Sequence, residues 1–98
     1  MGTGWLIPLD GPQTGELFQL RADRTVVGTS PDCDVMLIDP SISGRHAEFT
    51  ATAHGFRVSD LGSTGGTYVN GKRVSSEDLV DNDSLRMGSV NFIFKLRG

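Results

Sequence analysis

The sequence predicts an all-β domain, folded as a sandwich or a barrel, on the strength of three observations. Apolar residues recur at every second position in several segments, which is the period of a strand with one face against a core. Clusters of Gly, Pro, Asp, Asn and Ser separate these segments at short intervals. Only residues 75–80 are suited to a helical turn, and six residues are too few for a helix that is stable by itself.

The expected strands follow in chain order. The first is indicated by Trp5, Ile7 and Leu9, which share one parity, and the last by the alternation of Val90 and Phe92. Between them, short β-type runs predict strands at residues 16–20, 25–28, 34–38, 47–51, 55–60 and 84–87. A further strand is expected to end at Asn70-Gly71, because Asn-Gly is among the strongest hairpin signals, and a return strand begins at Lys72.

Size and composition are those of one globular domain spanning residues 1–98. The chain has 98 residues, of which 37% are hydrophobic and 21% charged. A net charge of −3 argues against a nucleic-acid binder, and no apolar segment is long enough to insert in a membrane. No secretory signal is visible, and the single cysteine, Cys33, permits no internal disulfide. We therefore expect a cytoplasmic protein.

One stretch comes close to a nucleotide-binding loop. Residues 66–72 have the G-x4-G-K spacing, but Arg73 stands where a P-loop needs Ser or Thr to hold magnesium. The context also differs, because a P-loop opens a helix, whereas this stretch is β-branched and turns at Asn70-Gly71. We interpret it as a hairpin, and we expect no nucleotide or other cofactor.

Few residues of the sequence have the pattern of a catalytic or metal-binding site. His46 and His54 lack the spacing of metal ligands. Ser43 lies near His46, but the surrounding sequence has no nucleophile-elbow pattern, so His46 is expected to order neighbouring loops. Cys33 stands between two aspartates, which give no reason for a lowered thiol pKa. We predict that the chain is not an enzyme and holds no metal.

Three loops at residues 28–34, 40–46 and 60–72 are rich in Gly, Ser, Thr, Arg and His. Glycine lets backbone N–H groups approach an anion, hydroxyls donate to phosphate oxygens, and basic side chains add charge-assisted bonds. Loops at one end of a β scaffold are a common binding surface. This chemistry predicts a surface that holds a phosphate group without cutting it.

Four blocks of sequence, in this order, resemble those of a forkhead-associated (FHA) domain. They are VVGTSPDCDVML, PSISGRHAEF, DLGSTGGTYVNGKRV and DNDSLRMGSVNFIF, and the resemblance runs from about Leu17 to Phe94. It implies a β-sandwich of about eleven short strands with binding loops at one end. It also implies a non-catalytic signalling module that binds a protein or peptide partner phosphorylated on threonine by a Ser/Thr kinase.

The resemblance assigns roles to individual residues. Ser43 and Thr64 match the hydroxyl residues that contact the phosphate in the family, and His46 matches the histidine that braces the loops. Thr29 occupies the position of an arginine that grips the phosphate, and Gly65 that of an asparagine that holds the peptide backbone. The loop framework is expected to consist of Gly28, Gly62, Ser63, Gly66, Thr67, Asn70 and Gly71.

The substitutions at Thr29 and Gly65 predict weakened or altered phosphate recognition. Loss of one charge-assisted hydrogen bond costs about 1.5–3 kcal/mol, and Arg45 or Arg73 is a candidate source of compensating charge. Thr29→Arg together with Gly65→Asn is expected to strengthen phosphothreonine binding if the rest of the site is intact. The alternative is an FHA-like scaffold that binds its partner without phosphate. Either way, the chain is expected to be the N-terminal part of a longer protein.

Overall fold

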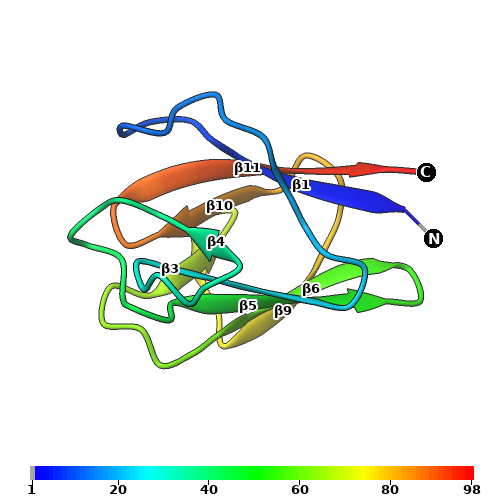
Figure 1. The fold of residues 1–98 in the computed structure, drawn as a ribbon. Coiled ribbons are helices and arrows are strands. Elements are labelled where there is room, and N and C mark those ends of the chain that lie inside the picture. Colours follow the sequence, from blue (N-terminus) through cyan, green and yellow to red (C-terminus); the bar gives the residue numbers. More distant parts are fainter. Residues whose placement is uncertain (1) are drawn as a thin grey trace.

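Two β-sheets stack face to face in the computed structural model, which describes residues 2–98 (Figure 1). Six strands form one sheet in the order β2-β1-β11-β10-β7-β8, and five form the other in the order β4-β3-β5-β6-β9. The eleven strands are β1 (Thr3–Pro8), β2 (Phe18–Gln19), β3 (Arg24–Gly28), β4 (Val35–Met36), β5 (Ala47–Thr52), β6 (Gly55–Asp60), β7 (Thr67–Val69), β8 (Lys72–Arg73), β9 (Ser76–Leu79), β10 (Ser84–Met87) and β11 (Val90–Arg97). The predicted all-β sandwich is confirmed.

The core lies between the sheets and is closed by aromatic side chains from both. Phe49 of β5 and Phe92 and Phe94 of β11 are fully buried. Phe56 of β6 meets Phe94 edge to face, with ring centroids 6.0 Å apart. Strands β5 and β11 carry apolar side chains at every second position, and this alternation correctly predicts which of their side chains face the core.

The first strand is present, but its core-facing residues are not the ones that its largest side chains suggest. Leu6 and Pro8 point inward and are buried, whereas Trp5 and Ile7 are half-buried and Leu9 is 53% exposed. Both parities of this strand are apolar, so the alternation could not say which one faces the core.

Residues 75–80, whose sequence is suited to a helical turn, instead contain the whole of strand β9 (Ser76–Leu79). The strand pairs with β6, placing Leu79 beside Phe56 and Asp78 beside Arg57. Leu79 is buried, and Arg57 Nε lies 2.8 Å from Asp78 Oδ1. Pairing with a neighbouring strand overrides the weak local preference of so short a segment. No helix in residues 2–98 could cross a membrane.

The hairpin at Asn70-Gly71 is confirmed. Both residues have positive φ, 51° and 83°, as the tight turn between β7 and β8 requires. The Asn70 side chain secures the turn, because its Nδ2 donates to Asp83 at 3.0 Å and its Oδ1 accepts the Ser84 N–H at 3.0 Å. The turn therefore belongs to the scaffold rather than to a binding surface.

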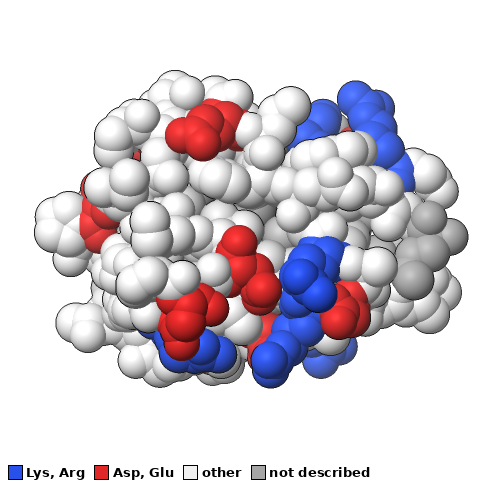
Figure 2. Space-filling model, in the orientation of Figure 1, with Lys and Arg blue, Asp and Glu red and all other residues white. Residues whose placement is uncertain are grey.

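Three loops rich in Gly and Ser gather at one end of the sandwich, and both termini lie at the other end (Figure 1). These are residues 29–34 between β3 and β4, residues 37–46 before β5, and residues 61–66 between β6 and β7. On the face drawn in Figure 2, acidic and basic side chains are interspersed among uncharged ones. A continuous basic surface of the kind that binds nucleic acid is not visible on that face.

Candidate binding site at the loop end of the sandwich

The first and second loops are joined by backbone hydrogen bonds. Thr29 N–H donates to Ser43 O at 3.1 Å, and Ser30 N–H donates to Gly44 O at 3.0 Å. The two chains approach so closely that a Cβ at Gly28 would lie 2.1 Å from Gly44 O. Gly28 is therefore required by the contact between the loops, as expected for a framework residue.

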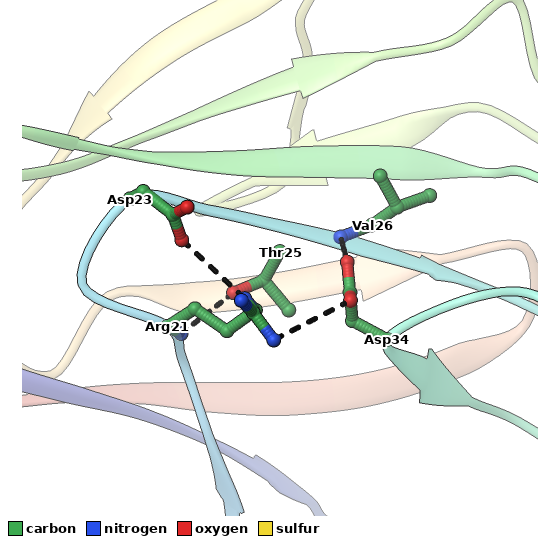
Figure 3. Close-up of polar contacts among 5 residues, drawn as sticks. All are labelled: Arg21, Asp23, Thr25, Val26 and Asp34. Atoms are coloured by element: carbon green, nitrogen blue, oxygen red, sulfur yellow. Dashed lines mark hydrogen bonds and ion pairs between the residues drawn. The ribbon is translucent and has the colours of Figure 1, made fainter.

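The base of the first loop is tied back to strand β3 by Asp34 (Figure 3). Asp34 Oδ2 accepts the Val26 N–H at 2.8 Å, and Asp34 Oδ1 lies 4.0 Å from Arg21 Nη1. The fully buried Thr25 accepts the Arg21 N–H at 2.7 Å. The bond from Val26 fixes the end of the first loop at Asp34, and the bond from Arg21 fixes the start of strand β3.

The third loop is organised by Asp60, the last residue of β6. Its Oδ2 accepts the N–H groups of Gly62 and Ser63 at 3.0 Å each. Its Oδ1 accepts the Ser63 hydroxyl at 2.6 Å and the Thr67 hydroxyl at 2.8 Å. Ser63 in turn accepts the Gly66 N–H at 3.0 Å. Gly62, Ser63 and Thr67 thus meet at one carboxylate, and Gly66 is joined to it through Ser63.

These bonds also keep Asp60 ionised. Partial burial acts to raise the pKa of its carboxyl, but the hydrogen bonds from Ser63 and Thr67 and from the Gly62 N–H oppose it. The hydrogen bonds outweigh burial, so the pKa of Asp60 lies below the ordinary value for aspartate.

His46 connects the second and third loops from a fully buried position. Its Nδ1 accepts the Ser43 N–H at 3.1 Å, and its Nε2 lies 2.9 Å from Gly66 O. An acceptor at Nδ1 requires the tautomer in which Nε2 carries the proton and donates to Gly66 O. Its backbone extends the connection, since its N–H donates to Val27 O and its carbonyl accepts the Leu61 N–H, each at 2.9 Å.

This arrangement rules out His46 as a base for Ser43. Both ring nitrogens are occupied by backbone groups, and the bond from Ser43 comes from its N–H rather than its hydroxyl. A serine nucleophile needs the ring within reach of its Oγ. Cys33 is equally unsuited, because burial and then the charge of Asp32 raise the pKa of its thiol.

Ser43 and Thr64 meet although they are far apart in the chain. Ser43 Oγ accepts the Thr64 N–H at 3.2 Å. Ser43 is half-buried and Thr64 is exposed. The contact brings the Thr64 backbone beside the Ser43 hydroxyl, so two hydroxyl residues from separate loops are neighbours, and hydroxyl groups are able to donate to a phosphate.

Thr29 and Arg45 flank Ser43. Thr29 is half-buried and adjoins Ser43 through the backbone bond already described. The Arg45 side chain reaches back to the first loop, where its Nη1 lies 3.4 Å from Asp32 Oδ2. Asp32 also accepts the Ser30 hydroxyl at 2.5 Å, which is the main reason that its pKa is lowered. Asp32 is thus a carboxylate that competes with any anionic ligand for Arg45.

Gly65 is packed against two other backbone segments. A Cβ at this position would lie 2.9 Å from Ser41 O and 2.9 Å from Gly88 Cα. The Gly65→Asn half of the double substitution proposed from the sequence therefore collides with backbone and does not fit this structure.

The carboxylates of Asp32, Asp34 and Asp60 order the loops, and the sequence analysis above assigns no role to them. Asp60 opens the block DLGSTGGTYVNGKRV. A signal for Asp60 was present, because an Asp followed by Gly and Ser commonly bonds the N–H groups two and three residues ahead. The contact of Asp32 with Arg45 joins two loops and has no such local signal.

Comparisons with known proteins identify the family of the chain. The sequence model of the FHA domain matches residues 25–88. The glycogen accumulation regulator GarA of Mycolicibacterium smegmatis is 39% identical over 93 residues, which are 95% of this chain and 59% of that protein. The oxoglutarate dehydrogenase inhibitor of Corynebacterium diphtheriae is also 39% identical over 93 residues, again 95% of this chain and 65% of that protein. The chain therefore spans about three fifths of the length of these relatives.

Solved structures show the same fold. One from a study of phosphothreonine-dependent FHA domain interactions superposes with a TM-score of 0.89 at 31% identity, covering 100% of this chain and 99% of that one. The FHA domain of FhaA, solved in complex with the intracellular domain of Rv3910, has a TM-score of 0.82 at 30% identity, covering 97% of this chain and 100% of that one. The chain belongs to the forkhead-associated (FHA) family of non-catalytic protein-interaction domains.

Proposed function

We propose that the loop end of the sandwich binds a protein partner at a phosphorylated threonine, with Ser43, Thr64 and Arg45 supplying the phosphate contacts. The observation that carries this proposal is the contact of Ser43 Oγ with the Thr64 N–H at 3.2 Å, which joins a half-buried and an exposed hydroxyl residue from separate loops. The relatives studied for phosphothreonine-dependent interactions support it.

Arg45 supplies the positive charge for the phosphate that Thr29 lacks. A hydroxyl at position 29 carries no positive charge, whereas Arg45 lies two residues after Ser43 and reaches the first loop. A phosphate at Ser43 and Thr64 would compete with Asp32 for the Arg45 guanidinium. Because a doubly charged phosphate is a stronger partner than a carboxylate, Arg45 turns to the ligand and Asp32 lowers the affinity.

The test measures fluorescence anisotropy of a labelled phosphothreonine peptide pool with degenerate flanks, beside the same pool with threonine or phosphoserine. We expect binding of the phosphothreonine pool alone, weakened about 10-fold or more by Ser43→Ala or by Thr64→Ala. Thr50→Ala, on the exposed side of β5, is the matched control and leaves the affinity unchanged. Absence of phosphate-dependent binding at millimolar peptide would overturn the proposal.

Two further variants test the source of positive charge. Asp32→Asn is expected to strengthen binding by freeing Arg45, and Arg45→Gln to weaken it and to cancel the gain of Asp32→Asn in the double variant. Thr29→Arg is expected to strengthen binding about 10- to 150-fold, the range for one charge-assisted hydrogen bond. Equal affinities in all these variants would show that Arg45 does not contact the phosphate.

The packing of Gly65 favours a second candidate, a scaffold that binds its partner without phosphate. Gly65 has no side chain that could hold a peptide backbone, and Ser41 and Gly88 leave no room for a side chain at this position. A partner that stays bound after phosphatase treatment, and whose binding is unaffected by Ser43→Ala, would select this candidate.

We also propose the setting in which the domain works. Because the chain spans 59% of one relative and 65% of another, it is the FHA portion of a longer protein. A cytoplasmic location is supported by the single cysteine and by a phosphorylated partner. Mass spectrometry of the native protein checks the first point, and cell fractionation checks the second.

A further inference from the structure

Two arginines flank one tyrosine on the outer face of the six-stranded sheet. In the register of the sheet, Tyr68 of β7 pairs with Arg86 of β10 on one side and with Arg73 of β8 on the other. Arg86 Cζ lies 4.1 Å from the centroid of the Tyr68 ring, within the range of a cation–π contact. The neighbouring residues Val69 and Leu85 are buried, so the three named side chains share the opposite, solvent-facing side.

One end of this row of side chains lies beside the third loop. A Cβ at Gly66 would lie 2.9 Å from Arg73 Nε and 3.1 Å from Tyr68 Cε1. The Arg73 guanidinium therefore occupies the space above Gly66, two residues after Thr64. A ligand held at Thr64 and leaving over this edge of the sheet would meet Arg73 first and Arg86 next.

The two arginines differ from most of the others in having no carboxylate nearby. Arg21, Arg24, Arg45 and Arg57 each lie within 4.0 Å of an acidic side chain. Within residues 2–98, neither Arg73 nor Arg86 has such a partner at that distance. The acidic group at the far end of the row is Asp10, which is held by the Asn91 side chain at 2.9 Å.

The surface beside the ring is hollowed. A depression of about 110 Å³ is lined by Tyr68, Ser84, Arg86 and Asn91, together with Gly71 and Leu85. A guanidinium held over an aromatic ring keeps its N–H donors directed outward, where they can form the forked hydrogen bonds that carboxylates accept. The hollow therefore combines a cationic group, a hydroxyl and an apolar ring edge.

From these observations we propose that Arg73, Tyr68 and Arg86 form a docking surface for an acidic segment of the same partner whose phosphothreonine binds at the loops. The inference rests on the proposed function. The surface recognises carboxylates of Asp or Glu side chains that continue from the phosphopeptide over the β7–β8 edge. It contributes to the choice of partner and leaves the phosphate contacts themselves unchanged.

The contacts are exposed, so their effect is modest and sensitive to salt. Exposed ion pairs are worth little individually, and two of them together are expected to change the affinity about 3- to 10-fold at low ionic strength. Raising the salt to about 0.5 M should remove most of this difference, because the screening length then falls well below 10 Å.

The experiment compares three labelled peptides built on the tightest member of the phosphothreonine pool. One has neutral flanks, one carries five glutamates before the core, and one carries five glutamates after it. We expect one acidic extension to bind about 3- to 10-fold more tightly than the neutral peptide. The variant Arg73→Gln/Arg86→Gln should lose that gain, so that it binds the acidic peptide no more tightly than the neutral one. Arg24→Gln/Arg57→Gln, on the other sheet, is the matched control and keeps the gain.

Charge reversal distinguishes direct contact of the two arginines with the peptide carboxylates from a general effect of the net charge of the domain. The variant Arg73→Glu/Arg86→Glu should prefer a lysine-extended peptide over the glutamate-extended one. The inference is overturned if the neutral phosphopeptide binds but neither acidic extension adds affinity, or if the gain survives in Arg73→Gln/Arg86→Gln. Failure of every phosphopeptide, neutral or acidic, would instead contradict the proposed function on which this inference rests.

Discussion

Asp60 shows how much of the binding surface can depend on a single side chain. Its two carboxylate oxygens accept bonds from Gly62, Ser63 and Thr67, and these bonds shape the loop that presents Thr64. Ser63 and Thr67 are buried, so their hydroxyls would lack an acceptor without this carboxylate. Leaving buried polar groups unpaired costs more than the net gain of making the bonds.

The substitution Asp60→Asn is therefore expected to lower the free energy of unfolding by about 1–3 kcal/mol, because an amide cannot accept all of these bonds. Urea denaturation followed by tryptophan fluorescence measures the change. Asp78→Asn is the control, since Asp78 forms an exposed ion pair with Arg57 and should change stability by less than about 1 kcal/mol. Equal losses in the two variants would contradict the role of Asp60.

The same carboxylate predicts a dependence on pH. The pKa of Asp60 is lower in the folded chain than the value of about 3.9 expected when unfolded. Its contribution to stability is thus fully present above pH 4–5 and is lost as pH falls through the folded pKa. Urea unfolding of the unmodified chain and of Asp60→Asn between pH 7 and pH 2.5 should give a difference that shrinks on acidification. A difference that grows at low pH would refute this assignment.

At the scale of the elements, the β7–β8 hairpin depends on backbone conformation rather than on packing. Gly71 has φ of 83°, and a Cβ there would meet nothing within 4 Å. Gly71→Ala is thus expected to cost about 1 kcal/mol through the left-handed backbone alone. Gly44 makes a close control, because it has an ordinary φ and a Cβ there would meet only Ser30 Cβ, at 4.0 Å. Thermal unfolding should show Gly44→Ala unchanged or slightly stabilised.

The loops form one unit through His46, which bonds the second and third of them. His46→Ala would leave the Ser43 N–H without a partner and Gly66 O with the Gly88 N–H alone, and it would open a cavity, so we expect a loss of about 2–4 kcal/mol. Hydrogen exchange should show faster exchange of the loop amides at Ser43 and Leu61. His54→Ala, in the exposed β5–β6 turn, should stay within about 0.5 kcal/mol of the unmodified chain.

For the whole molecule, a ligand that binds only the folded state must raise the unfolding temperature. At a peptide concentration 100 times Kd the gain is about 2.7 kcal/mol, which corresponds to roughly 10–20 °C for a domain of this size. We expect this shift with a phosphothreonine peptide and none with its unphosphorylated form, as measured by differential scanning fluorimetry. Equal shifts with both peptides would favour the phosphate-independent scaffold.

Much of the fold and part of the site could be predicted from the sequence. The alternation in β5 and β11 located the core, and Asn70-Gly71 located a hairpin, because both signals are local. Residues 75–80 and the first strand were less predictable. The former became strand β9 by pairing with β6, and the latter has apolar residues on both faces. In each case a partner distant in sequence decided the outcome.

By itself, the sequence determined the all-β sandwich, the three loops rich in Gly and Ser, and the presence of Ser43, Thr64 and His46 among them. Those features depend on residue type, on spacing and on backbone preferences that act over a few residues. Only the tertiary structure decided that Asp32 holds Arg45, that Gly65 has no room for a side chain, and that Arg73 and Arg86 share one face with Tyr68. Each of these depends on how separate segments pack, which no local pattern encodes.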